Sequence, residues 1–402
     1  MKIMMVHNTY QFPGGEDVVF ENERSILLHR GHRVVTYCRS NTEISEMSLA
    51  RRIVMLRTFI SSEQAKQEVL ELLKREKPDI VHVYNTFTMI TPSIYDSCQE
   101  ANIPVVQALQ NYRLVCPTAT LFRSGRTCVD CQEKGVWQSV LHGCYRNSRL
   151  ISAAAALSLA AHRKRSSWDT HVDAYVAPSE FVRQKLAEAA IPDRRIFLKP
   201  NFVSQDPGVR SSLGSYALFV GRLSVEKGLS TLLRAWKQLQ MVLKLHIVGD
   251  GPLRQQLEAE ISQNDLSNVQ LMGWLDRKRV QEAMKDAKFL IFPSEWFEPF
   301  GQTIVEAFAC GVPVIGSRLG AVEELISDGR TGLLFAPGNA GDLALKIDWA
   351  WRHPREIAEM GRFARREYEA KYTAAINYTQ LMAIYDRVLK DRNSITSSGK
   401  PN

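Results

Sequence analysis

The sequence predicts an α/β protein made of two doubly wound domains, each a mostly parallel sheet covered by helices. Three observations predict this class. The chain has 402 residues, more than one hydrophobic core usually supports. Short apolar runs rich in β-formers alternate with helix-length amphipathic stretches, which is typical of βαβ units. Residues 199–214 concentrate Pro, Gly, Ser and Asn between two such series and predict a linker.

The first series predicts a domain over residues 1–198, with helices such as 17–30 and 63–74 between its strands. Its strands are expected at residues 2–7, 32–38, 80–84, 105–109 and 174–177. The pattern restarts with ALFVGRL and predicts a second domain over residues 215–374, whose later strand signals are KLHIVGDG, VQLMGW, AKFLIFPS, GVPVIGS and TGLLFAP. Ligands of open α/β sheets bind at the carboxyl ends of the strands, so we expect the two domains to face a central cleft.

Composition narrows the class of protein without giving a function. An apolar content of 45% and a charged content of 23% are ordinary for a soluble enzyme. The net charge of +8 favours anionic partners such as nucleotide phosphates or acidic lipids. The basic residues read as dispersed, without a helix-turn-helix, zinc-finger or RNP-like signature, so we expect no nucleic-acid partner.

The sequence also predicts a cytoplasmic location. The opening MKIMMVHNTY is too short for the core of a signal peptide and reads as a first strand. The longest nearly uncharged apolar stretch, residues 150–161, is shorter than the ~20 residues that a transmembrane helix needs.

Two glutamates frame the start of a predicted helix in SEWFEPFGQTIVEAFACG. Glu298 precedes this helix, and Glu306 lies inside it. The first helical positions, at Gly301, Gln302 and Thr303, would offer backbone N–H groups and a positive dipole end to a phosphate. Glu306 would accept hydrogen bonds from a ribose diol, and Glu298 would reach the sugar or the diphosphate. The alternative is that both glutamates are solvated on a helix surface.

Two cations follow another predicted strand in ALFVGRLSVEKG. Arg222 offers a planar fork of donors and Lys227 a point charge, so together they can hold a diphosphate and stabilise the charge that grows on it as it leaves. The sequence has no Asp-x-Asp pair, so we expect no metal or other cofactor to be needed for catalysis. Ordinary surface ion pairs are the alternative for both cations.

The motifs GRLSVEKG, VGDGP, MGW and EPFGQTIVEAFACGVPVIGS occur in this order over residues 216–340. They resemble the nucleotide-binding domain of family-4 retaining glycosyltransferases, which have the GT-B fold of two Rossmann-like domains. The resemblance implies that Arg222 and Lys227 hold the diphosphate of a nucleotide sugar. It further implies that Glu306 binds the ribose and Glu298 the donor sugar region.

The same resemblance places Gly273 and Trp274 beside the base of the donor. The first half resembles the acceptor domain of the family, in which Gly14 and Gly15 of QFPGGED would bring backbone N–H groups to the diphosphate or the sugar. A plain turn is the alternative. Gln110 stands where the family usually has a histidine that meets the donor sugar, and an amide cannot carry a proton.

Four of the seven cysteines cluster in the sequence at Cys116, Cys128, Cys131 and Cys144. Their spacing is compatible with a structural zinc site. Buried thiols or a redox pair are the alternatives.

Two stretches, residues 49–60 and 160–168, are basic and amphipathic enough to touch the inner face of a membrane or to be solvated helical faces. Residues 375–392 predict a final amphipathic helix, which in resembling enzymes crosses back to the first domain.

The expected activity is that of a hexosyltransferase: retaining transfer of a sugar from a nucleotide diphosphate sugar to a hydroxyl of a saccharide or lipid-linked acceptor, in polysaccharide or glycolipid biosynthesis. A non-hydrolysing nucleotide-sugar epimerase of the same fold is one alternative, and a catalytically inactive nucleotide-sugar-binding protein is another. A dinucleotide-dependent dehydrogenase is disfavoured because neither domain shows Gly-x-Gly-x-x-Gly after a strand.

Overall fold

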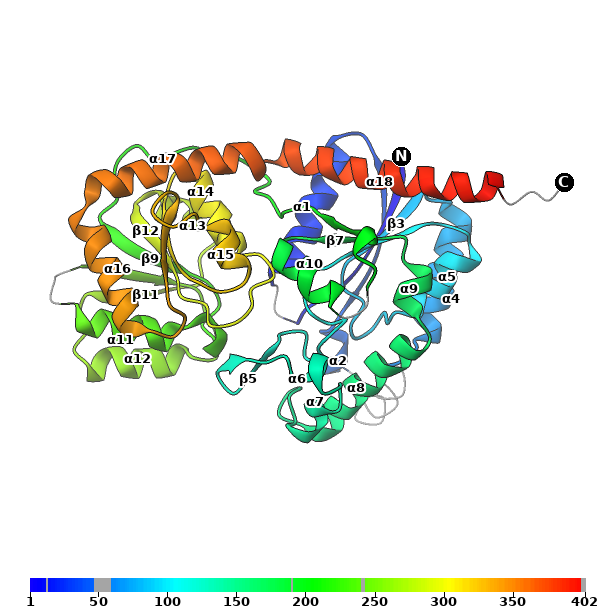
Figure 1. The fold of residues 1–402 in the computed structure, drawn as a ribbon, viewed down its shortest axis with the longest axis horizontal. Coiled ribbons are helices and arrows are strands. Elements are labelled where there is room, and N and C mark those ends of the chain that lie inside the picture. The colour runs from blue at the N-terminus through cyan, green and yellow to red at the C-terminus, as the bar shows by residue number, and fades with distance from the viewer. Residues whose placement is uncertain (12–13, 47–58, 189–190, 240–242, 399–402) are drawn as a thin grey trace. The chain divides into compact units, whose positions relative to one another are not determined.

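The computed structural model describes residues 1–11, 14–46, 59–188, 191–239 and 243–398, which form two compact α/β units (Figure 1). The first unit comprises residues 1–121 and 128–201 together with the chain from Ala375 onward. The second comprises residues 122–127 and 202–374. The predicted α/β class is confirmed, and each unit is described separately below.

The sheet of the first unit has six strands in the order β2-β1-β3-β4-β7-β8, and every neighbouring pair is parallel. These strands are β1 (Lys2–Thr9), β2 (Arg33–Ser40), β3 (Ile80–Val83), β4 (Val105–Ala108), β7 (Ala174–Ala177) and β8 (Ile196–Leu198). The helices are α1 (Gly15–His29), α2 (Glu43–Glu46), α4 (Glu63–Glu76), α5 (Ile94–Glu100), α6 (Asp130–Glu133), α7 (Gln138–Leu141), α8 (Arg149–Lys164), α9 (Ser167–His171), α10 (Glu180–Ala187), the 3-10 turn η1 (Asp193–Arg195) and α18 (Ala374–Ser398).

The second unit also has a six-stranded parallel sheet, in the order β11-β10-β9-β12-β13-β14. Its strands are β9 (Tyr216–Val220), β10 (Leu245–Val248), β11 (Val269–Gly273), β12 (Ala287–Phe292), β13 (Val314–Ser317) and β14 (Gly332–Phe335). Its helices are η2 (Val225–Lys227), α11 (Leu229–Gln238), α12 (Arg254–Gln263), α13 (Arg277–Lys285), α14 (Gln302–Ala309), α15 (Ala321–Leu325), α16 (Ala340–Arg352) and α17 (Pro354–Lys371). A short hairpin, β5 (Phe122–Arg123) with β6 (Arg126–Thr127), completes the strands.

Alternation along the strands builds the core of the second unit on both faces of its sheet. In β9, Ala217 and Phe219 join one cluster, which includes residues of α11 and α16. Leu218 between them joins the opposite cluster, which includes residues of α14 and α17. Each buried side chain of this size contributes about 1.5–3 kcal/mol. Because both faces are covered, the strands read as continuous apolar runs, which is why the sequence predicted them well.

The C-terminal helix α18 packs on the first unit, as Figure 1 shows, and not on the unit that precedes it in the sequence. Its buried residues Leu381, Ile384, Tyr385 and Val388 follow helical spacing and join the same core cluster as Ile3 of β1. No helix among the described residues is both long and apolar enough to cross a membrane.

A buried polar network holds α18 to the sheet of the first unit. Lys199 donates from Nζ to Oε1 of Glu23 at 2.6 Å, and the two side chains are 1% and 2% exposed. Tyr84 donates its hydroxyl to the other carboxylate oxygen at 2.5 Å. His82 Nδ1 bonds Tyr385 of α18 at 2.7 Å. The network therefore joins α1, β3, the end of β8 and α18, and removing one charged partner would leave the other charge buried and unpaired.

Burial lowers the pKa of His82 to about 4, with Glu23 acting against this shift and Lys199 adding to it. For Glu23 itself, burial opposes ionisation, but Lys199 and His82 outweigh it and the pKa is lowered. Both folded-state pKa values are therefore depressed.

We expect the first unit to lose stability as pH falls from about 6.5, the pKa of histidine in an unfolded chain, toward 4. In this window the unfolded chain binds a proton at His82 that the folded chain does not. The depression corresponds to about 3 kcal/mol in the free energy of unfolding. His82→Asn keeps a polar atom near Nδ1 but has no imidazole to titrate. Urea midpoints measured between pH 5 and 8 should fall less steeply for this variant, and equal slopes would contradict the assignment.

Candidate active site

The strand order of the second sheet reverses between β9 and β12, which are hydrogen-bonded neighbours. The chain runs from β9 through β10 to β11 at one edge and from β12 through β13 to β14 at the other. Ligands of open α/β sheets bind at such a reversal, beyond the carboxyl ends of the strands. The loops that follow β9 and β12 are therefore the first place to look for a site.

The loop after β9 is anchored to the sheet by one residue and exposes the residue before it. Leu223 is buried, and its N–H donates to the carbonyl of Asp250 after β10 at 3.0 Å. Arg222, one residue earlier, is exposed. The loop after β12 is tied to this one, because the N–H of Glu295 donates to the carbonyl of Glu226 at 2.8 Å. Arg222 is thus presented on a rigid loop at the carboxyl edge of the sheet.

Lys227 and Glu298 meet at the reversal. Lys227 Nζ donates to Oε1 of Glu298 at 2.6 Å, and Ser294 donates its hydroxyl to the same oxygen at 2.7 Å. Glu298 is 5% exposed, whereas the side chain of Lys227 is 20% exposed. The ammonium also lies 5.4 Å from the ring centre of Trp296. Lys227 is therefore held by a buried carboxylate of the site and not by a surface ion pair.

Glycine makes this approach of the two loops possible. Gly228, directly after Lys227, has φ +69°, and a Cβ added there would lie 1.9 Å from the carbonyl oxygen of Pro293 after β12. No other residue fits this position without moving backbone. The glycine of the sequence Glu-Lys-Gly is thus required by a close contact between two loops that are distant in the sequence.

The N-terminus of α14 opens onto the same edge. Gly301 is its N-cap, with φ +113° and no side-chain cap. The side-chain amide of Gln302 donates from Nε2 to the carbonyl of Phe202 at 3.0 Å. The first N–H groups of a helix, here those of Gln302 and Thr303, have no partner within the helix and suit an anion.

Glu306 lies one turn further along α14 and is half-buried. Burial raises its pKa to about 7, although Arg277 and a hydrogen bond from Gln302 act in the opposite direction. Its carboxyl group is therefore balanced between the neutral and charged forms near neutral pH. Such a shift is common among side chains that bind a ligand.

Gly273 and Trp274 lie at the end of β11, two strands from β9. The carbonyl of Gly273 accepts a hydrogen bond from the N–H of Gly249 at 2.8 Å, which ties the ends of β10 and β11 together. The indole of Trp274 is 74% exposed. Its surface is free to cover a flat ligand.

In the first unit, Gly14 caps the N-terminus of α1 and Gly15 is its first residue. The N–H of Gly14 donates to Asp17 at 2.7 Å. Residues 12 and 13 of the predicted glycine loop lie outside the described residues. The loop is followed by a cluster that the sequence analysis missed.

That cluster is centred on Glu16, which is 7% exposed. Glu16 accepts hydrogen bonds from the hydroxyl of Tyr10 at 2.6 Å and from the amide of Asn111 at 3.0 Å. Burial raises the pKa of Glu16, and the charge of His7 and these hydrogen bonds oppose the rise. The loops after β1 and β4 thus meet at one buried carboxyl group. In the sequence, the only sign of this cluster was the glutamate of GGED, which is Glu16.

Gln110 does not point freely into solvent. Its amide nitrogen donates to Asn201, and the amide nitrogen of Asn201 donates back to Gln110, both at 2.9 Å. Asn201 is 3% exposed. The substitution of the usual histidine is thus matched by a reciprocal amide pair, which satisfies one donor and one acceptor on each partner.

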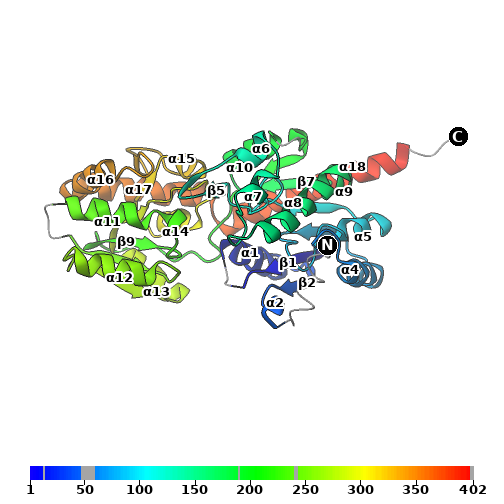
Figure 2. The same cartoon turned by 90° about the horizontal axis from the view of Figure 1, so that it is seen from below.

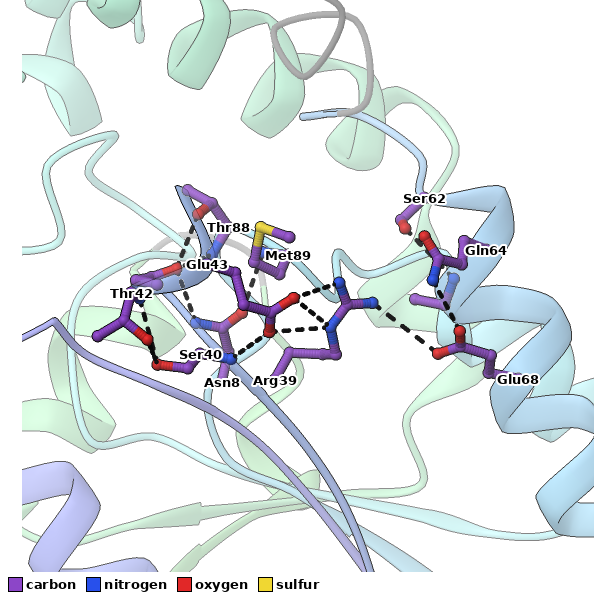
Figure 3. A network of polar contacts seen from close by, with 12 residues as sticks. Asn8, Arg39, Ser40, Thr42, Glu43, Ser62, Gln64, Glu68, Thr88 and Met89 are labelled. Atoms are coloured by element: carbon purple, nitrogen blue, oxygen red, sulfur yellow. Dashed lines mark hydrogen bonds and ion pairs between the residues drawn. The ribbon is translucent and has the colours of Figure 1, made fainter. Parts of the chain in front are cut away.

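The loops at the carboxyl ends of β1 and β2 are braced by polar contacts (Figure 3). Asn8, on β1, accepts a hydrogen bond from the N–H of Met89 at 3.0 Å. Arg39, on β2, donates to Glu43 at 2.6 Å and lies 3.8 Å from Glu68 of α4. These contacts join β1 to the segment after β3, and β2 to α2 and α4.

A hollow with a cavity volume of about 50 Å³ lies beyond the carboxyl ends of β3 and β4 in the first unit. Its lining includes Phe87, Asn111 and Arg113. The guanidinium of Arg113 stacks on the ring of Phe87 at 3.9 Å and donates to the carbonyl of Pro117 at 2.6 Å. The hollow combines apolar and aromatic walls with a few polar groups, as binding pockets usually do.

The four clustered cysteines are free thiols in the structure. Burial raises the pKa of Cys131 to about 12, and neighbouring Cys116, Cys144 and Cys128 contribute to the rise. Within the described residues, no group of three or more His, Cys, Asp or Glu side chains is placed to hold a metal ion. The geometry thus offers no fit for zinc here, and the zinc site stays a prediction that metal analysis of the purified chain would decide.

A family model matches the second unit by sequence, and solved structures match nearly the whole chain by fold. Residues 211–367 match the family model described as Glycosyl transferases group 1. An uncharacterized glycosyltransferase, MJ1178 of Methanocaldococcus jannaschii, is 33% identical over 178 residues, which are 44% of this chain and 49% of that protein. The D-rhamnosyltransferase WbpZ of Pseudomonas aeruginosa is 33% identical over 168 residues, 41% of this chain and 44% of that protein. These matches thus span less than half the length of either relative.

Solved structures match nearly the full chain. HepE from Anabaena, in complex with UDP and glucose, has a TM-score of 0.66 and 17% identity, with 98% of this chain and 100% of that one covered. Sucrose-phosphate synthase from Thermosynechococcus elongatus has a TM-score of 0.70 and 16% identity, with 97% and 99% covered. The chain therefore has the fold of GT-B glycosyltransferases, as the motifs predicted.

We expect Gly228→Ala to destabilise the second unit more than Gly329→Ala does. Both glycines have a positive φ, +69° and +75°, so both variants carry a left-handed cost of about 1–2 kcal/mol. Only at Gly228 does the new methyl group also meet a backbone oxygen, whereas nothing lies within 4 Å at Gly329. Urea unfolding of the two variants provides the comparison, and equal losses would show that the two loops do not depend on this contact.

Proposed function

We propose that the chain is a retaining glycosyltransferase that moves a sugar from a nucleotide diphosphate sugar to an acceptor hydroxyl, in the assembly of a polysaccharide or glycolipid. The observation that carries the proposal is the meeting of Lys227 and Glu298 at the reversal of the second sheet, next to the N-terminus of α14. The matching family model covers this part of the chain. The neighbour HepE was solved with UDP and glucose, which supports a nucleotide-sugar donor.

Arg222, Lys227 and the N-terminus of α14 would hold the donor diphosphate. The bond from the sugar to the diphosphate breaks in the reaction, and negative charge grows on the departing phosphate oxygen. Cations on rigid loops stabilise this charge without having to reorganise. The pair with Glu298 keeps the ammonium of Lys227 in place before the donor arrives and leaves part of it exposed.

The remaining donor contacts follow from the same edge of the sheet. Glu306 would accept hydrogen bonds from the ribose, and Gly273 and Trp274 would lie along the base. In the first unit, the backbone N–H of Gly15 would be offered to the diphosphate or the sugar, whereas that of Gly14 already donates to Asp17. Gln110 cannot take a proton, so the departing phosphate oxygen would accept the proton of the attacking hydroxyl, which enters from the face that the phosphate leaves.

The hollow at the carboxyl ends of β3 and β4 is the best candidate for the acceptor in the first unit. Its lining combines the aromatic ring of Phe87 with the guanidinium of Arg113, which stacks on that ring and donates to the carbonyl of Pro117 from one of its nitrogens. A saccharide or a lipid-linked saccharide fits this chemistry.

The activity can be tested with a panel of nucleotide sugars. We expect slow release of nucleoside diphosphate from one donor even without an acceptor, and product of unchanged anomeric configuration with one. Arg222→Ala and Lys227→Ala should each reduce turnover by on the order of 100-fold, because their contacts strengthen in the transition state.

Lys346→Ala and Arg355→Ala, which remove cations of α16 and α17 in the same unit, are the matched controls and should stay within twofold of the wild type. Epimerised donor without transfer would favour the epimerase, and tight binding without turnover would favour an inactive binding protein. Normal turnover in both Arg222→Ala and Lys227→Ala would overturn the proposed roles of Arg222 and Lys227.

Glu306 gives the proposal a pH signature. Its pKa of about 7 means that the unliganded site must lose a proton before the carboxylate can accept hydrogen bonds from the ribose. UDP-glucose keeps its own charge between pH 6 and 8, so we expect it to bind about tenfold more weakly at pH 6 than at pH 8. Calorimetry on the wild type and on Glu306→Gln measures this. The variant should bind weakly with little pH dependence, and an unchanged pH dependence would assign the titration to another group.

A further inference from the structure

Helix α8 buries Ser and His side chains and exposes two of its three leucines, which is unusual for a surface helix. Ser158 is buried and donates to the carbonyl of Phe59 at 2.7 Å. His162 is also buried and bonds the carbonyl of Ile60 at 2.7 Å. On the outer face, Leu150 is 68% exposed and Leu157 is 47% exposed. These two leucines are therefore largely exposed to water instead of being buried in the core of this unit.

The neighbouring short helix α7 adds further exposed apolar side chains beside α8. Figures 1 and 2 both show α7 beside α8. Trp137, just before α7, is 53% exposed, and Leu141 at its end is 61% exposed. Residues 150–162 carry no Lys, Arg, Asp or Glu. We call Trp137, Leu141, Leu150 and Leu157 the outer apolar face.

Exposed cations lie at both ends of α8, beside the outer apolar face. Residues 134–168 contain six Lys and Arg and no Asp or Glu, although Glu133 and Asp169 directly flank this segment. Arg146 and Arg149 lie at one end of α8, and Lys164 and Arg165 lie at the other. All four are exposed, and among the described residues no carboxylate forms an ion pair with any of them. A local group of unpaired cations thus lies at α8, while most of the 51 Lys and Arg are spread along the rest of the chain.

We propose that the outer apolar face binds the surface of an anionic phospholipid bilayer. Leucine and tryptophan side chains enter the boundary between headgroups and acyl chains, while flanking arginine and lysine side chains reach the phosphates. A protein partner would also cover apolar residues, but exposed cations at both ends of α8 that form no ion pair with the described carboxylates match the uniform negative charge of a lipid surface. Lys164 and Arg165 belong to the predicted basic stretch 160–168, and of the other predicted stretch, 49–60, residues 49–58 lie outside the described residues.

The inner face of α8 adds a functional consequence. Ala155, Ser158 and Leu159 line the hollow of the first unit. One helix would thus contact the membrane on one side and form a wall of the hollow on the other. This arrangement would keep a lipid-linked acceptor near the site, although the lipid contact itself requires no nucleotide sugar and stands apart from the proposed function.

The experiment is co-sedimentation of the full chain with vesicles, without donor or acceptor. We expect binding to vesicles of equal parts phosphatidylglycerol and phosphatidylcholine, and little binding to phosphatidylcholine alone. Lys164→Gln/Arg165→Gln should weaken binding roughly 20-fold. Leu150→Ser/Leu157→Ser should weaken it at least about tenfold by removing apolar area from the contact.

Each variant has a matched control in the second unit. Leu345→Ser replaces a leucine that is 71% exposed on α16, and Arg355→Gln/Arg362→Gln removes two exposed cations of α17. Both should bind as the wild type does. Equal binding by the test variants and their controls would overturn the proposal, as would absence of binding to anionic vesicles. A dimer in lipid-free solution that Leu150→Ser/Leu157→Ser abolishes would instead make this face an interface between copies.

Discussion

The reversal of strand order between β9 and β12 is the constraint on which the candidate site depends. The helix that follows β9, α11, packs on one face of the sheet, and the helix that follows β12, α14, packs on the other. The two helices therefore lie on opposite faces of the sheet, and the loops that lead to them meet at the carboxyl ends of the neighbouring strands. Where the loops meet, Lys227 donates a hydrogen bond to the buried carboxylate of Glu298 at 2.6 Å. Gly273 and the N-terminus of α14 can contribute to the same candidate site because both lie at the carboxyl edge of this sheet.

The first unit depends on a different interaction, the buried ion pair of Glu23 with Lys199. Taking two charges out of water is costly, so an apolar pair of similar volume would often be at least as stable. What the ion pair adds is a defined set of partners: Tyr84 and, through His82, Tyr385 of α18. We infer that the apolar contacts of α18 supply most of its binding energy, whereas the polar network sets its register on the sheet.

Sequence reasoning found the strands and the motif residues because both depend on local signals. Buried parallel strands read as apolar runs, and the loop residues follow them directly. It could not find the partners. Lys227 and Glu298 are 71 positions apart, and Gln110 and Asn201 are 91 positions apart, so their contacts follow from strand order and not from spacing. Spacing likewise suggested zinc at four cysteines, and whether these cysteines bind a metal stays a prediction.

The outer face of α8 was missed for a related reason. The sequence shows an apolar stretch too short to cross a bilayer, but periodicity cannot tell which side of a helix faces the core when both sides are made of Ala, Leu and Ser. The structure decides this, because Ser158 and His162 reach the carbonyls of Phe59 and Ile60 on the inside. Once those polar contacts fix the rotation of the helix, Leu150 and Leu157 have no place inside. Their exposure therefore follows from the inner hydrogen bonds, and a chain that keeps leucine there retains an apolar surface that serine would remove at little cost to the fold.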